Sequence, residues 1–295
     1  MKITVASRES RLAIIQSQLV MEAIKAAHPE IELELLTMKT TGDKILDRTL
    51  DKIGGKGLFV KELDKALLEG RADLTVHSYK DMPMEEDPAL PVVAVSPRED
   101  PRDVLILPLG AKELDPALPL GCASARRRIQ LQKLYPHMQV KPVRGNVLTR
   151  LQKLDRGEYS GLVLAYAGIK RLGLQARIAH IYSVAQILPA ACQGVMAVQA
   201  RRDFDATPVR AAHDPLAKVV CDCERSFVRT LDGGCSSPVA AYATVKGDII
   251  TLTGLFAGEG SDDFAIDSCR GPIDRPVELG QTLAEKMRGA FGGGR

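Results

Sequence analysis

The first two-thirds of the chain alternate short apolar runs, typical of buried strands, with segments whose apolar residues recur at helical spacing. Ser10 precedes a segment with Leu12, Ile15 and Leu19 on one face, which predicts a helix capped by that serine. Alternation of this kind predicts α/β domains with largely parallel sheets. The predicted strands are 3–6, 31–38, 74–77, 104–107 and 161–165, and further helices are predicted over 59–69 and from Ser124 and Asn146.

The pattern changes after Pro215. A helix running through Phe227 leads into two alternating strands, 240–245 and 249–256, and a final helix is predicted near 277–287. The sequence therefore predicts two α/β domains followed by a smaller α+β domain.

The stretch 39–57 is rich in Gly, Asp, Thr and Lys and has no firm periodicity. Long loops of this kind are usually functional or disordered. We expect this one to be mobile and to cover the ligand cleft when it is ordered.

The composition is ordinary for a soluble globular protein: 295 residues, of which 45% are hydrophobic and 26% charged. That length exceeds one hydrophobic core, so two or three domains are expected. A net charge of +3 does not call for a nucleic-acid partner. The sequence begins without a leader-like segment and has no membrane-spanning apolar run, so we expect a cytoplasmic protein with no membrane partner.

One cysteine stands on a loop that leaves its sulfur uncrowded. Cys235 follows Gly233-Gly234, two residues that tolerate positive φ and carry no side chain. Free cysteines usually lie among apolar neighbours and rarely need such clearance. A helix C-cap followed by an ordinary buried cysteine has a similar sequence, so both interpretations stay open. The six cysteines are expected to be free thiols, and Cys221-x-Cys223 lacks the second ligand pair of a metal site.

Basic residues gather where open α/β sheets bind ligands, at the carboxyl ends of strands and at helix N-termini. Arg126 and Arg127 stand in the first turn of the predicted helix at Ser124, where cations oppose the helix dipole unless an anion is bound. Each could be a solvated surface arginine, but together they favour a cleft for a polyanion. Arginine suits carboxylate or phosphate, and the lack of a Gly-rich phosphate loop in the sequence favours carboxylates. The basic positions are Arg8, Lys80, Arg126, Arg127, Arg144, Arg150 and Arg171.

Asp81 is the odd residue in this basic set. It follows the predicted strand 74–77 beside Lys80, and Pro83 ends the segment rigidly. It could merely pair with Lys80, or it could stabilise a cation that develops on the substrate, a role no arginine can take. The sequence leaves both open.

Together these motifs resemble those of the porphobilinogen deaminase family, and the resemblance covers essentially the whole chain. No single motif decides it; their order and spacing make it specific. The motifs are Arg8-x-Ser10-x-Leu12-Ala13, Gly54-Gly55-Lys56-Gly57-Leu58-Phe59, His77-Ser78-x-Lys80-Asp81-x-Pro83, Ser124-x-Arg126-Arg127, Arg144-Gly145-Asn146-Val147-x-Thr149-Arg150, Gln193-Gly194 and Leu231-x-Gly233-Gly234-Cys235-x-x-Pro238.

The resemblance implies a transferase that joins four porphobilinogen units head to tail, with loss of ammonia, and releases hydroxymethylbilane by hydrolysis. It implies a covalent dipyrromethane cofactor held by a thioether at Cys235, and a catalytic role for Asp81 in stabilising cationic intermediates. The residues implied to bind the cofactor and the substrate are Arg8, Ser10, Lys52, Ser78, Lys80, Ser124, Arg126, Arg127, Arg144, Arg150, Arg171 and Gln193.

The family fold implies two periplasmic-binding-protein-like α/β domains and a small C-terminal α+β domain that carries the cysteine. We expect domain 1 to comprise residues 1–97 and 194–211, domain 2 residues 98–193, and domain 3 residues 212–295. A monomer is implied by the resemblance alone.

The sequence departs from the family pattern at three positions. Cys122 and Ala123 replace residues that usually carry hydroxyls, and Cys192 replaces a glycine and places a second thiol near the expected cleft. A non-enzymatic alternative is an anion-binding receptor or effector-sensing module with two such domains. That alternative fits the arginines but leaves the Cys235 loop and the third domain unexplained.

Overall fold

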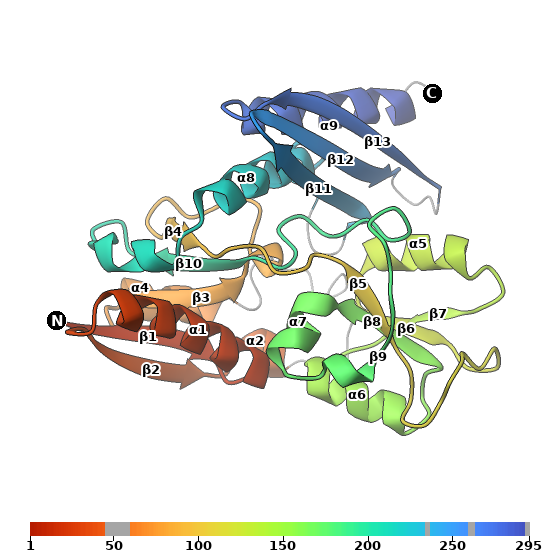
Figure 1. The fold of residues 1–295 in the computed structure, drawn as a ribbon, viewed down its shortest axis with the longest axis horizontal. Helices are drawn as coiled ribbons and strands as arrows, with labels where there is room; N and C mark the ends of the chain where they lie inside the picture. Colours follow the sequence, from red (N-terminus) through yellow and green to blue (C-terminus); the bar gives the residue numbers. More distant parts are fainter. Residues whose placement is uncertain (45–59, 234–236, 259–262, 293–295) are drawn as a thin grey trace.

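The computed structural model describes residues 1–44, 60–233, 237–258 and 263–292 (Figure 1). These residues form two five-stranded sheets with flanking helices and a three-stranded antiparallel sheet near the C-terminus. The expected combination of two α/β units with a smaller α+β unit is therefore confirmed. Cys235 and Lys52 lie outside the described residues, as does most of the expected loop 39–57.

The first sheet has the order β2-β1-β3-β10-β4. Its first three strands are parallel, and β10 runs antiparallel to both of its neighbours. The strands are β1 (Lys2–Arg8), β2 (Glu32–Met38), β3 (Leu74–Ser78), β4 (Val92–Val95) and β10 (Met196–Ala200).

The second sheet repeats this arrangement in the order β7-β6-β8-β5-β9. Its first three strands are again parallel, and β5 is antiparallel to both β8 and β9. The strands are β5 (Asp103–Ile106), β6 (Leu120–Cys122), β7 (Val140–Pro142), β8 (Gly161–Ala165) and β9 (Ile178–Ile181).

The chain crosses between the two sheets twice, and each crossing leads into an antiparallel strand. Residues 96–102 connect β4 to β5, and residues 182–195 connect β9 to β10. The two connections touch: the backbone N–H of Glu99 donates to the carbonyl of Gly194 at 3.3 Å. Gly194 has φ of 93°, and a Cβ there would meet the Glu99 carbonyl oxygen at 2.2 Å. Only glycine fits this crossing point.

Three helices of the first two units, α1, α5 and α6, begin at the cap residues that the sequence predicts. The side chain of Ser10 accepts a hydrogen bond from the Ala13 N–H at 3.4 Å, and that of Asn146 accepts one from Thr149 at 3.0 Å. Ser124 also occupies the N-cap position of its helix, but its side chain makes no capping hydrogen bond. The helices are α1 (Arg11–Ala27), α4 (Lys61–Leu68), α5 (Ala125–Leu134), α6 (Val147–Asp155) and α7 (Tyr166–Arg171).

A short helix, α2 (Thr41–Lys44), occupies the start of the stretch expected to be a loop. Glu62 of α4 stabilises its first turn. The Glu62 carboxylate accepts hydrogen bonds from the N–H of Thr41 at 2.8 Å and from its hydroxyl at 2.5 Å.

The third unit packs two helices against its sheet. Phe227 is fully buried in this core, which also includes Tyr79, Val95 and Ala197 of the first unit. In Figure 1, α8 lies between the third sheet and β10. The elements are α8 (Pro215–Thr230), β11 (Val239–Lys246), β12 (Ile249–Ala257), β13 (Phe264–Pro272) and α9 (Pro276–Gly292).

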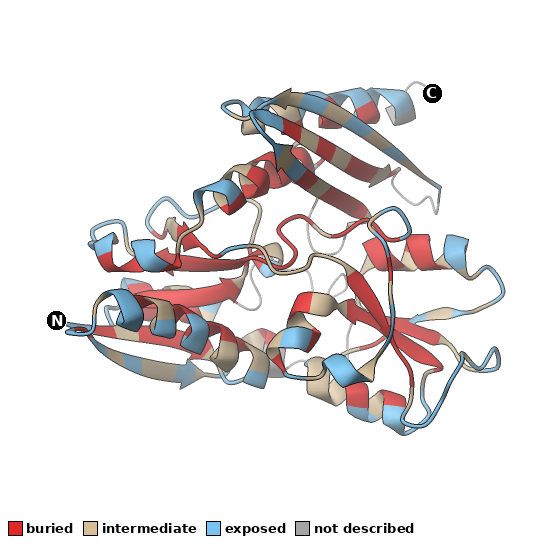
Figure 2. Cartoon of the chain, viewed as in Figure 1, coloured by how far each residue is buried: buried red, intermediate tan, exposed pale blue. Residues whose placement is uncertain are grey.

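Burial is concentrated in the central strands of the two larger sheets and on the inner faces of the helices (Figure 2). Within the described ranges, every helix is too short or too polar to cross a membrane. The same ranges contain no group of three or more His, Cys, Asp or Glu side chains that could hold a metal ion.

Candidate active site

A pocket opens at the carboxyl ends of β1 and β3, where parallel sheets commonly bind ligands. Arg8 and Ser10 reach it from the β1–α1 junction, and Ser78 and Asp81 from the end of β3 and the 3-10 turn that follows. Asp81 is exposed. The structure thus brings together a cation, two hydroxyls and a carboxylate that the sequence predicts.

Gln16 is a further polar residue in this pocket that sequence reasoning missed. It lies on the buried face of α1, and its Nε2 donates to the Ser78 hydroxyl at 2.9 Å. The Ser78 hydroxyl is in turn 3.3 Å from Gln16 Oε1. Gln16 shares this buried face with Ser17, Val20 and Ile24. The available signal was its spacing from Leu12 and Leu19, which places it on their face of the helix.

His77 lines the same pocket and is held neutral. Burial, reinforced by the nearby charge of Arg8, lowers its pKa to about 4. Its Nε2 lies 2.9 Å from the Thr75 hydroxyl. The imidazole therefore contributes no positive charge at neutral pH.

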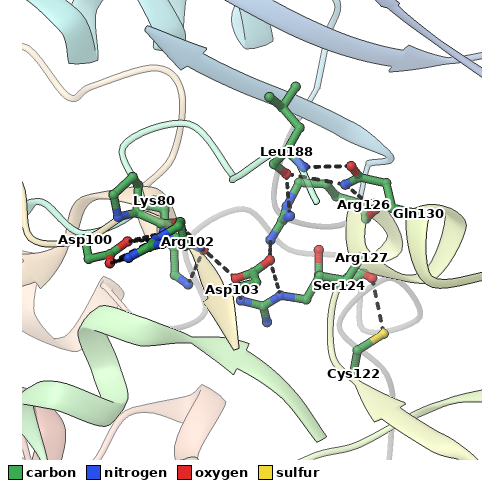
Figure 3. Close-up of polar contacts among 12 residues, drawn as sticks. Lys80, Asp100, Arg102, Asp103, Cys122, Ser124, Arg126, Arg127, Gln130 and Leu188 are labelled. Carbon is green, nitrogen blue, oxygen red and sulfur yellow. Dashed lines mark hydrogen bonds and ion pairs between the residues drawn. The ribbon is translucent and has the colours of Figure 1, made fainter. Parts of the chain in front are cut away.

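A second cluster centres on Asp103, the first residue of β5, whose side chain is completely buried (Figure 3). Its carboxylate accepts hydrogen bonds from Arg127 Nε at 3.0 Å, Arg127 Nη2 at 2.7 Å and Arg126 Nη2 at 2.9 Å. Burial alone raises the pKa of Asp103, but the two guanidinium groups outweigh it and hold that pKa well below its usual range. Asp103 is a charged internal partner that sequence reasoning did not find.

This partner explains the two arginines at the start of α5. The sequence suggested that an external anion relieves their conflict with the helix dipole, and the structure supplies Asp103 as an internal one. Arg126 is only 2% exposed and also donates from Nη1 to the Leu188 carbonyl at 2.6 Å. The unusual position of these arginines therefore does not by itself require a bound ligand.

Gln193 connects this cluster to the first unit. Its Nε2 donates to Asp103 Oδ1 at 2.7 Å and to the Pro101 carbonyl at 2.6 Å, and its Oε1 accepts from Lys80 Nζ at 3.1 Å. Burial lowers the pKa of Lys80 to about 8, although the neighbouring Asp81 favours its charged form. Lys80, Gln193 and Asp103 thus form one polar chain across the junction of the two sheets.

Arg150 lies in the same electrostatic environment. Its Nε donates to the Gly145 carbonyl at 2.8 Å, at the N-terminal end of α6. Burial, together with the charges of Arg127 and Arg144 and against that of Asp81, lowers the pKa of Arg150 to about 10. Positive charge is therefore in excess around Asp81.

Arg171 lies at the crossing point between the sheets. Its Nη2 donates to the Gly194 carbonyl at 2.7 Å, and burial lowers its pKa.

Near the start of α5, the thiol of Cys122 lies 3.7 Å from the carbonyl oxygen of Ser124, to which it can donate a hydrogen bond. Burial raises the pKa of Cys122.

The predicted cofactor cysteine lies in the connection between α8 and β11. Before that cysteine the positive φ falls on Asp232, at 54°, and not on Gly233 as the sequence suggested. A Cβ at Gly233 would still be crowded, lying 3.0 Å from the Val228 carbonyl and 3.3 Å from the Val239 side chain. Cys192, the other thiol expected near the cleft, is completely buried, and its pKa is raised well above the usual value by that burial.

Glu224 of α8 links the third unit to both connections between the sheets. Its buried carboxylate accepts two hydrogen bonds from Arg98, each at 2.7 Å. It also accepts from the N–H groups of Cys192 and Ala243, both at 2.7 Å. The helix that leads to the Cys235 loop is thereby fixed against the junction.

Known families and proteins match this chain along nearly its whole length. The family model described as "Porphobilinogen deaminase, dipyromethane cofactor binding domain" matches residues 3–208, and "Porphobilinogen deaminase, C-terminal domain" matches residues 218–289. A curated porphobilinogen deaminase of Acetivibrio thermocellus is 57% identical over 291 residues, covering 98% of this chain and 99% of its own. That of Alkaliphilus oremlandii is 59% identical over 289 residues, covering 98% and 97%. That of Thiobacillus denitrificans is 44% identical, covering 97% and 94%.

Proposed function

The chain belongs to the porphobilinogen deaminase family, and on that premise we propose that Asp81 is its catalytic carboxylate and that the basic residues around it bind substrate carboxylates. The enzyme joins four porphobilinogen units head to tail, with loss of ammonia, and releases hydroxymethylbilane by hydrolysis. Its dipyrromethane cofactor supplies the pyrrole carbon to which the first unit is added.

The residues present fit a dipyrromethane. Each pyrrole carries two carboxylates and one N–H, so the group needs several cations and at least one acceptor. Lys80, Arg127 and Arg150 lie close enough to Asp81 for their charges to influence one another. Burial is the main cause of the lowered pKa values of Lys80 and Arg150, and neighbouring arginines add to it. Carboxylates bound beside them would favour their charged forms.

This concentration of cations around one exposed carboxylate is the observation that carries the proposal. Asp81 would accept pyrrole N–H hydrogen bonds and stabilise the positive charge left on porphobilinogen when ammonia departs. A preorganised charge at the reacting centre is usually the largest single contribution to catalysis. The arginines cannot take this role, because they repel a cationic intermediate.

The remaining predicted residues are proposed to hold the carboxylates of the cofactor and the growing chain. The hydroxyls of Ser10 and Ser78 in the pocket, and of Ser124 at the start of α5, can donate further hydrogen bonds to the carboxylates that the cations bind. The proposed binding residues within the described ranges are Arg8, Ser10, Ser78, Lys80, Ser124, Arg126, Arg127, Arg144, Arg150, Arg171 and Gln193. Lys52 is proposed from the sequence alone.

We also propose a thioether at Cys235, a monomer in the cytoplasm, and domain limits at 1–97 with 194–211, 98–193 and 212–295. The sheet topology supports these limits, because β10 joins the first sheet after the second is complete. The receptor alternative is not favoured, since the deaminase family models match both larger units and the third unit. Sedimentation of the cofactor-loaded protein tests the monomer.

Steady-state kinetics test whether Asp81 serves catalysis and the cations serve substrate binding. Asp81→Asn should lower kcat with little change in KM for porphobilinogen, whereas Arg8→Leu should mainly raise KM. A fall in kcat shared equally by both variants would contradict separate roles for the carboxylate and the cation.

A further inference from the structure

We propose that Arg225 is a positioning residue for Asp81, fixing the catalytic carboxylate to the helix that leads to Cys235. The proposal deepens the proposed function and rests on the role given there to Asp81. Arg225 does not line the pocket and was not among the residues that the sequence singled out. It acts through the segment that follows β3.

The guanidinium of Arg225 holds that segment on both sides of Asp81. Its Nη2 donates to the carbonyls of Pro83 at 2.5 Å and Met84 at 3.1 Å. Its guanidinium carbon lies 4.5 Å from the centre of the Tyr79 ring, a cation–π contact. Tyr79 and Pro83 each stand two residues from Asp81, so one side chain fixes both flanks of the carboxylate.

Glu86 completes the arrangement. Its Oε1 accepts a hydrogen bond from the Tyr79 hydroxyl at 3.1 Å and lies 3.6 Å from Arg225 Nη2. The Tyr79 ring is 1% exposed and the Arg225 side chain 5% exposed, so both contacts are shielded from water. A buried arginine with this many partners has little freedom to move, and neither has the segment that it holds.

Two neighbouring residues of α8 thereby fix two different parts of the enzyme. Glu224 binds Arg98 and the Cys192 N–H on the two connections between the sheets, and Arg225 binds the Asp81 segment. Arg225 thus ties the segment that carries Asp81 to α8, the helix that ends at Thr230.

The chemistry of this contact requires arginine. Its planar fork donates to carbonyls while its face lies on an aromatic ring, whereas a lysine ammonium is a compact point charge. Arg225→Lys therefore keeps the charge and loosens the geometry. Small misplacements of a reacting group can lower a rate about a hundredfold. We expect single-turnover ammonia release by holo-Arg225→Lys to fall about tenfold or more, with a smaller change in KM.

A merely structural role for Arg225 would also lower activity, so the test is a double-mutant cycle with Asp81→Asn. If Arg225 acts through Asp81, Arg225→Lys should change ammonia release by less than about twofold once Asp81 is already Asn. Arg229→Lys is the matched control, because Arg229 lies one turn further along α8 and is exposed. It should release ammonia at the parental rate. Intact mass confirms the cofactor in each variant, and thermal unfolding confirms the fold.

If Arg225→Lys does not fold, Glu86→Gln replaces it in the same cycle, since Glu86 is partly exposed and touches both Tyr79 and Arg225. It should show a smaller loss that also disappears in the Asp81→Asn background. Two results would overturn the role of Arg225 and leave the proposed function standing. One is an equal loss of ammonia release from the Arg225 or Glu86 substitution in both backgrounds. The other is no loss from that substitution in the parent, in an experiment where Asp81→Asn itself is slow. Parental ammonia release by Asp81→Asn would instead overturn the proposed function, and this inference with it.

Discussion

Asp103 and Arg127 form a buried bidentate ion pair. Arg127 Nε lies 3.0 Å from Asp103 Oδ2, and Arg127 Nη2 lies 2.7 Å from Asp103 Oδ1. The pair ties the first residue of β5 to the first turn of α5, and Arg126 and Gln193 bind the same carboxylate. The cations at the start of α5 are thus held in fixed positions before any ligand arrives. That is the condition under which charged groups bind and stabilise most effectively.

Replacing Asp103 with Asn should be severely destabilising. Two buried guanidinium groups would lose their anion, and breaking a buried pair in this way typically costs about 3–5 kcal/mol in the free energy of unfolding. Asp100→Asn is the control, because the Asp100–Arg102 pair lies nearer the surface, with Arg102 42% exposed. Such pairs are worth about 0–1 kcal/mol. Urea unfolding of both variants checks the difference, and equal small losses would show that Asp103 is not the charge partner described.

The pH dependence of substrate capture should report Lys80. Its pKa in the unliganded site is lowered by burial to about 8, so the ammonium that attracts a carboxylate is lost as the pH rises through that value. We therefore expect kcat/KM, which reports the free enzyme, to decline above about pH 8. A bound carboxylate raises the pKa of Lys80, so the decline in kcat should come at higher pH.

Lys80→Arg serves as the comparison, because a guanidinium stays charged over this range. The decline in kcat/KM above pH 8 should be absent from that variant, whatever its absolute rate. An unchanged pH profile would assign the decline to another group.

Cofactor attachment should depend on Cys235 alone. Cys235→Ser should lack the covalent dipyrrole, as judged by intact mass and by colour with an acidic aldehyde reagent. Cys192→Ser should keep it, because Cys192 is completely buried and its raised pKa disfavours the reactive thiolate. An adduct that survives in Cys235→Ser, or is lost from Cys192→Ser, would overturn the assignment of the attachment to Cys235 alone.

Local signals in the sequence predicted much of the fold. Ser10 and Asn146 begin helices by hydrogen bonds to residues three positions later, so the information lies within one turn. The apolar run Gly161–Ala165 is a central strand of its sheet, as expected. The strand β13 was not predicted, because its residues are exposed or half-buried at the edge of a sheet and carry little apolar pattern.

The sequence predicts the cations of the site but gives no indication of the residues that position them. Asp103 meets Arg127 across 24 residues and Gln193 across 90, and those contacts exist only once β5 lies beside α5 and the second connection. The sequence pattern does not single out Glu224 or Arg225. The structure buries both, because α8 packs against the junction and not against solvent.

Single-turnover ammonia release from porphobilinogen by cofactor-loaded Asp81→Asn tests the catalytic role of Asp81 most directly. The amide keeps the shape of the carboxylate and removes its charge, and loss of one preorganised electrostatic contact typically costs about a hundredfold or more in rate. Asp81→Glu keeps the charge at a shifted position and should retain more activity than Asp81→Asn. A drop of that size in Asp81→Asn, with porphobilinogen still bound, is the predicted result. Release at the parental rate would show that Asp81 is only a partner of Lys80 and would contradict the catalytic assignment.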